Sequence, residues 1–130
     1  MATTGERNTE MRQGDIFSHT LAVAAKINKG ALVVLDAGLA KAGLTDADVT
    51  TVGMATQTVD QAAGDTDVLV RTGTFLYANS AAADEITSAD IGANCYLVDD
   101  ETVAKTDDEA SRSVAGRVRA VEAGGVWITI

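Results

Sequence analysis

The chain has 130 residues, of which 46% are hydrophobic but only 4% aromatic, and its formal net charge is −9. This length corresponds to one domain. Its interior must be filled by Ala, Val, Ile and Leu, and a core of such small side chains is thin, so association with other copies of the chain is a reasonable way to complete it. The acidic balance argues against direct binding to nucleic acid or to an anionic membrane surface, because both need clustered Lys and Arg.

Residues 1–14, MATTGERNTEMRQG, show no apolar periodicity. This pattern predicts a flexible N-terminal arm, extended when the protein is alone. The arm also lacks the apolar core of a signal peptide, and no apolar run is long enough to span a membrane. We therefore expect no membrane association, and a protein that stays where it is made. Residues 15–130 contain neither a linker nor an internal repeat and predict a single β-rich domain.

The first half of this domain has the alternation that is typical of strands. The expected strands are IFSHTLAVAAKI (16–27), GALVVLD (30–36) and VTTVGMATQTV (49–59). Between the last two, AGLAKAGLTDADV (37–49) combines Ala and Leu with two glycines and predicts a loop with a short helix. DQAAGDTD then predicts a turn in which Gly64 adopts positive φ.

The segment TDVLVRTGTFLYAN (66–79) is rich in β-branched and aromatic residues and is expected to be one strand. Strict alternation divides its side chains between two faces: Leu69, Arg71, Gly73, Phe75 and Tyr77 on one, and Val68, Val70, Thr72 and Thr74 on the other.

A single short helical turn is expected in ITSADIG (86–92). Thr87 or Ser88 is the expected N-cap, Asp90 lies in the first turn, and Gly92 follows the end.

Four further strand-like segments follow: NCYLVDD, TVAKT, SVAGRVRAVEA and GVWITI. Gly124–Gly125 is expected to form a hairpin turn between the last two. Alternation predicts the following faces: Val114, Gly116, Val118 and Ala120 opposite Ala115, Arg117, Arg119 and Val121, and then Val126, Ile128 and Ile130 opposite Trp127 and Thr129. Seven or eight short strands with regular turn signals predict an all-β fold, a small β-barrel or sandwich with one short helical turn.

The acidic segment CYLVDDETVAKTDDEASRSVAG (95–116) raises the question of a metal or acid–base site. Its carboxylates occur where the chain has to turn, and Asp is suited to turns because it hydrogen-bonds nearby backbone amides. The spacing lacks the register of an EF-hand loop, and adjacent turn residues do not by themselves make a glycosidase pair. Solvated turn tips are the favoured interpretation, and a cation site or a catalytic pair are the alternatives. The residues concerned are Asp99, Asp100, Glu101, Asp107, Asp108 and Glu109.

Other candidate residues have simpler explanations than catalysis. Cys95, the only cysteine, is expected to be a buried apolar side chain, and it allows neither an intrachain disulfide nor a Cys-based zinc site. Ser80 has no partner base nearby, and Arg117 and Arg119 are expected to be solvated or paired with acids. Trp127 is interpreted as a core or interface anchor rather than a platform for sugar. We therefore predict no catalytic residue, no metal site and no cofactor.

The chain contains four segments in a definite order: KGALVVLDAGLAKAG, VGMATQTVDQAAGDTDVLVRTGTFLYAN, ITSADIGANCYLVDDETVAKTD and SRSVAGRVRAVEAGGVWITI. In this order they resemble the small head-decoration, or capsid-cement, proteins of tailed bacteriophages and prophages. The similarity covers about residues 26–130, and its most specific parts are ADIGANCYLVDDETVAKT and the closing GVWI.

The resemblance implies a small β-rich, β-tulip-like domain, commonly trimeric, on the outer surface of the virion capsid. It implies as partners the chain itself, as a homotrimer, and the major capsid protein. The protein would be made in the host cytoplasm, and no enzymatic activity is implied. Under this hypothesis Trp127 anchors the oligomer, and the arm contacts the capsid through Arg7, Met11, Arg12, Ile16 and Phe17. The alternatives are a phage tail or spike component, a carbohydrate- or cation-binding β-module, or a hydrolase.

Overall fold

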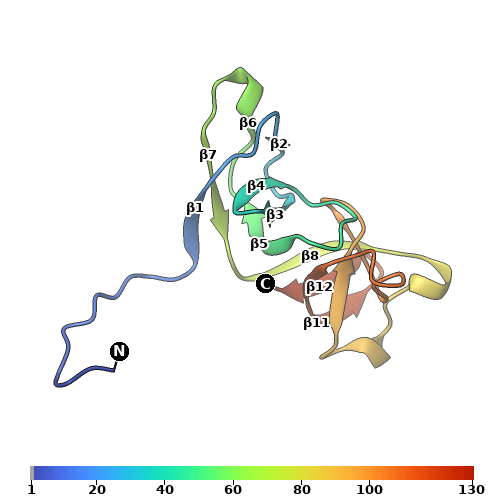
Figure 1. Cartoon of the computed structure of the whole chain (residues 1–130). Helices are drawn as coiled ribbons and strands as arrows, with labels where there is room; N and C mark the ends of the chain where they lie inside the picture. The colour runs from blue at the N-terminus through green and yellow to red at the C-terminus, as the bar shows by residue number, and fades with distance from the viewer. Residues whose placement is uncertain (1) are drawn as a thin grey trace.

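The computed structural model describes residues 2–130, and within that range it contains twelve strands and three single-turn 3-10 helices (Figure 1). The expected all-β class is confirmed. Two cores of buried apolar side chains are present, one under an open sheet and one inside a closed barrel. No helix in this range has the length and apolar character needed to cross a bilayer.

The open sheet is built from the N-terminal half of the chain in the order β1-β7-β5-β3-β4, with every neighbouring pair antiparallel. A two-stranded sheet, β2 with β6, packs its Ile27 and Val59 into the same core. The strands are β1 (Ile16–Thr20), β2 (Lys26–Ile27), β3 (Leu32–Asp36), β4 (Leu39–Ala42), β5 (Thr50–Ala55), β6 (Val59–Asp60) and β7 (Asp67–Arg71).

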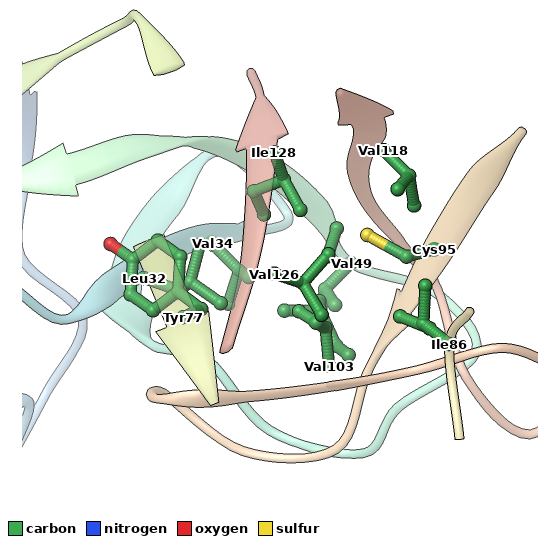
Figure 2. Packing of buried hydrophobic residues seen from close by; sticks show 12 residues of the cluster. Leu32, Val34, Val49, Tyr77, Ile86, Cys95, Val103, Val118, Val126 and Ile128 are labelled. Atoms are coloured by element: carbon green, nitrogen blue, oxygen red, sulfur yellow. The ribbon is translucent and has the colours of Figure 1, made fainter. Parts of the chain in front are cut away.

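The barrel closes in the order β10-β8-β12-β11-β9, and only the β10–β8 pair is parallel. Figure 2 shows its core, in which Cys95, Val118 and Ile128 pack with Ile86 from the preceding loop. The strands are β8 (Thr74–Asn79), β9 (Asn94–Leu97), β10 (Thr102–Ala104), β11 (Val114–Glu122) and β12 (Gly125–Thr129).

The segment 66–79 is two strands rather than the one expected. The chain leaves the open sheet after Arg71, passes through Thr72 and Gly73, and enters the barrel at Thr74. The predicted faces are therefore wrong across the junction: Leu69 lies on the exposed side of its sheet, whereas Tyr77 points into the barrel core. Side chains alternate between two faces within β7 and within β8. The faces of one strand do not predict those of the other, because the two strands belong to different sheets.

The helix expected within 37–49 is absent, and β4 occupies part of that segment. Asp36 pairs with Leu39, so Ala37 and Gly38 are the two central residues of a hairpin turn. Both have positive φ, 50° and 84°, which is the backbone of a type I′ turn. The hairpin lets Ala40 be buried in the open sheet, and this tertiary contact overrides the helical tendency of Ala and Leu.

Two irregularities in β11 overturn its predicted alternation. The register shifts between Val114 and Gly116 against β9, and again between Val118 and Ala120 against β12. Because a bulge adds one residue on one strand, Ala115 and Val118 both face the core while Val114 is exposed. The faces predicted for β12 are confirmed, with Val126 and Ile128 buried.

The β11–β12 turn also differs by one residue from the expectation. Glu122 pairs with Gly125, so Ala123 and Gly124 form the turn and Gly125 begins β12. The residue is glycine for a steric reason, because a Cβ at Gly125 would collide with the carbonyl oxygen of Tyr77 on β8.

The short helical turn was predicted correctly, and two more are present. Thr87 and Asp90 form a capping box around η3, and Gly92 follows it with φ of 92°. Gly64 ends another turn with φ of 108°, as expected. The three turns are η1 (Gln61–Ala63), η2 (Ala82–Asp84) and η3 (Ser88–Asp90).

Candidate functional site

Residues 2–15 contain no strand or helix and run away from the folded part of the molecule (Figure 1). The arm predicted over residues 1–14 begins at Met1, which lies outside the described residues. Its C-terminal end is attached to the open sheet, because the amide of Thr72 donates to the carbonyl of Asp15 at 2.9 Å. The arm thus leads directly into β1, the edge strand.

Three of the five arm residues singled out in the sequence lie together at the start of β1. The guanidinium carbon of Arg12 lies 4.3 Å from the centre of the Phe17 ring, and its Nη2 donates to the carbonyl of Ile16 at 3.3 Å. Ile16 and Phe17 are each 36% exposed. The other two residues stand apart, since Met11 is 93% exposed and Arg7 lies further out along the arm.

The backbone of β1 has one paired side and one free side. Asp15 and Leu21 are hydrogen-bonded to Thr72 and Thr66, the residues that flank β7. The odd-numbered residues between Asp15 and Leu21 therefore direct their backbone groups to β7. Ile16, Ser18 and Thr20 therefore direct N–H and C=O groups away from β7, and no strand in residues 2–130 pairs with them there. This row is the free edge of β1, which sequence alternation alone could not locate.

The free edge ends where β4 approaches. Leu21 forms a single parallel bridge with Ala40, and the amide of Ala22 donates to the carbonyl of Ala40 at 2.9 Å. β4 therefore contacts the chain only just after the C-terminal end of β1, and the stretch Ile16–Thr20 remains available for an added strand.

Trp127 lies on the outer face of the barrel, away from this edge. It is half-buried and stands in register between Leu76 on β8 and Ala120 on β11. Leu76 is 38% exposed, so the three side chains form a short apolar row across three strands. Leu76 was not singled out in the sequence, and the alternation expected for one continuous strand puts it on the same face as Val68 and Val70, which are buried.

The acidic segment forms turns, as expected. Oδ1 of Asp99 accepts hydrogen bonds from the amides of Glu101 at 2.9 Å and Thr102 at 2.8 Å. Asp108 accepts from the hydroxyl of Ser111 at 3.3 Å in a turn where residues 108–110 all have positive φ. Residues 2–130 contain no group of three or more His, Cys, Asp or Glu side chains arranged to hold a metal ion.

The two cations of that segment pair with acids outside it. Nη1 of Arg112 lies 3.3 Å from Oδ2 of Asp84, and Nζ of Lys105 lies 3.7 Å from Oδ1 of Asp90. A hydrogen bond from the hydroxyl of Thr106 at 2.6 Å is the main reason that the pKa of Asp84 is lowered, and Arg112 adds to it against the effect of desolvation. The pKa of Asp90 is lowered chiefly by the amide of Thr87. These pairs connect the loop 80–90 to Lys105 and Arg112, at the two ends of the segment that joins β10 to β11.

The remaining candidates have structural roles. Cys95 is fully buried in the barrel, and burial raises the pKa of its thiol to about 12, so the thiolate is scarce at neutral pH. The hydroxyl of Ser80 donates to the carbonyl of Val103 at 2.8 Å. Arg117 donates through Nε to the carbonyl of Gly92 at 2.8 Å rather than to an acid.

Among the open clefts on the surface of residues 2–130 are two with volumes of about 550 and 620 Å³. The first runs between the two halves beside Lys29, Tyr77 and Asp100, where the Tyr77 hydroxyl donates to the carbonyl of Gly30 at 2.8 Å. The second is lined mainly by small side chains of β5 and β11. Arg12, Ile16 and Phe17 lie together beside the unpaired backbone groups of β1. The edge of β1 is therefore the candidate site.

No protein-family model matches the sequence, and no curated protein or solved structure matches it either.

Proposed function

We propose that this protein is a structural virion component, a decoration or cement protein that binds the outer surface of a tailed-phage head as an oligomer. A homotrimer would bridge neighbouring copies of the major capsid protein and stabilise the shell against the pressure of packaged DNA. The resemblance over residues 26–130 is one support for the proposal. The observation that carries it physically is the free edge of β1 at the base of an extended arm.

A free edge of this kind suits recognition by strand addition. An extended segment of the capsid protein would pair with the backbone groups of Ile16, Ser18 and Thr20, and main-chain hydrogen bonds would supply the affinity. The exposed side chains of Ile16 and Leu69, on neighbouring strands, would add apolar contact on one side of the new strand. Binding only to the assembled shell would stabilise it by mass action, and three linked contacts would raise the effective affinity.

The test mixes the purified protein with undecorated heads from the same genome and follows co-sedimentation and the heat release of DNA. We expect stoichiometric binding and DNA release at a higher temperature. Deleting residues 1–14 should weaken binding to the heads while leaving the oligomer intact. Absence of co-sedimentation together with unchanged heat release would end the proposal, and unchanged binding after the deletion would end the role of the arm.

A further inference from the structure

We infer that Arg12 covers the free edge of β1 in the unbound protein and that a docking strand must displace it. This inference rests on the proposed function, in which the edge receives an extended segment of the capsid protein. The side chain that makes the contact belongs to the arm itself. The arm would therefore regulate access to the edge as well as contribute to binding.

The geometry of Arg12 places one guanidinium over two features of the edge. Its Nη2 donates to the carbonyl of Ile16 at 3.3 Å, and its central carbon stands 4.3 Å from the centre of the Phe17 ring. The Ile16 carbonyl is directed away from β7, as the bond from Thr72 to the preceding carbonyl, that of Asp15, requires. It is therefore an acceptor that an added strand would use. Arg12 occupies the position of that strand's first N–H donor.

The extent of the edge shows what this contact controls. Within residues 2–130, no strand lies beside the outward backbone groups from Ile16 to Thr20. At Ala22 the amide instead donates to the carbonyl of Ala40. Arg12 lies at the end of the row remote from β4. A docking strand can meet Ser18 and Thr20 without touching it, but pairing along the whole edge requires that the guanidinium leave Ile16.

Native sheets commonly place charged side chains at free edges, because an unpaired edge otherwise pairs with other chains. Arg12 fits that role, and its two contacts are exposed and individually weak. An exposed cation–π contact corresponds to a factor of about two to five in an equilibrium constant. The cover is therefore strong enough to slow unwanted pairing and weak enough for a specific strand to replace.

The test compares Arg12→Ala with Lys26→Ala, which removes one exposed positive charge outside the arm and outside the edge of β1. The measurement is the association of each variant with undecorated heads, at matched ionic strength. We expect Arg12→Ala to bind about two- to fivefold faster than Lys26→Ala. Equal or slower binding of Arg12→Ala would overturn the inference.

A second measurement uses the isolated protein and does not depend on heads. The side-chain NMR signals of Arg12 should carry a ring-current shift from Phe17 that disappears in Phe17→Leu; a missing shift in the unsubstituted protein would overturn the inference.

If the ring-current shift is present and no variant binds heads, the proposed function fails. The self-association of the variants then tests whether Arg12 covers the edge of β1. Greater self-association of Arg12→Ala than of Lys26→Ala in sedimentation would support the cover, and no difference would overturn it.

Discussion

Asn79 and Ile86 are joined by two hydrogen bonds. Nδ2 of Asn79 donates to the carbonyl of Ile86 at 2.8 Å, and the amide of Ile86 donates back to Oδ1 at 2.9 Å. Ile86 is only 1% exposed and packs into the barrel core beside Cys95 and Val103 (Figure 2). The amide side chain at the end of β8 therefore positions the apolar residue that the loop 80–90 contributes to the core.

Replacing this amide should destabilise the barrel. Asn79→Ala leaves both backbone groups of Ile86 without their partner, and we expect the free energy of unfolding to fall by about 2 kcal/mol. Asn79→Asp keeps the acceptor but places a carboxylate oxygen against the carbonyl of Ile86, so at neutral pH we expect a loss at least as large. Urea unfolding followed by Trp127 fluorescence measures both. Asn8→Ala, an exposed amide in the arm, is the control, and a loss no larger than that control would contradict the role of Asn79.

Gly124 and Gly125 offer a matched pair for the close packing of β12 against β8. A Cβ at Gly125 would collide with the carbonyl of Tyr77, and its φ of 143° is rare for other residues. A Cβ at Gly124 would meet only the carboxylate of Glu122 at 3.7 Å. We expect Gly125→Ala to cost about 1–3 kcal/mol of stability from strain alone and Gly124→Ala about 0.5 kcal/mol or less. Similar thermal unfolding midpoints for the two variants would contradict the close packing of Gly125 against the carbonyl of Tyr77.

Acid should weaken the contact that Asp84 makes between the loop 80–90 and the segment joining β10 to β11. Hydrogen bonding from Thr106 and pairing with Arg112 lower the pKa of Asp84 below its ordinary 3.8. A carboxyl whose folded pKa is depressed contributes stability above its ordinary pKa, and that contribution is lost as pH falls through the folded value. The difference in unfolding midpoint between the unsubstituted protein and Asp84→Asn should therefore shrink below about pH 4.

The titration itself can be followed by carbon NMR of the Asp84 carboxyl. Thr106→Val removes the main donor and should move the pKa of Asp84 back toward its ordinary value. A carboxyl that titrates at or above 3.8 in the unsubstituted protein, or one that Thr106→Val leaves unchanged, would refute this account.

Trp127 is the side chain whose truncation should most affect the oligomer that we propose. It lies in the apolar row with Leu76 and Ala120, and aromatic residues in such positions commonly contribute about 2 kcal/mol or more to an interface. Trp127→Ala should weaken self-association by at least about tenfold in sedimentation velocity. Leu69→Ala removes an exposed apolar side chain from the open sheet and should have little effect. Equal behaviour of the two variants would remove Trp127 from the interface.

Local patterns predicted much of the secondary structure because their causes are local. The capping box needs only Thr87 and Asp90 three residues apart, and the turn at Gly64 needs only a residue that accepts positive φ. Buried and exposed positions in β12 follow from the pleat alone. The acidic turns were predicted for the same reason, since Asp99 bonds amides two and three residues away.

The arrangement of strands was decided by contacts between distant residues. Nothing local marks Thr72 and Gly73 as the passage from one sheet to another, and the bulges in β11 exist only relative to β9 and β12. The candidate site belongs to this second class. The sequence by itself determined that Arg12, Ile16 and Phe17 are close along the chain, but only the pairing of β1 with β7, and the arrival of β4 at Ala22, decided which backbone groups were left free. A hydrogen-bonding edge is defined by its missing neighbour, and which neighbours are present is a property of the whole fold.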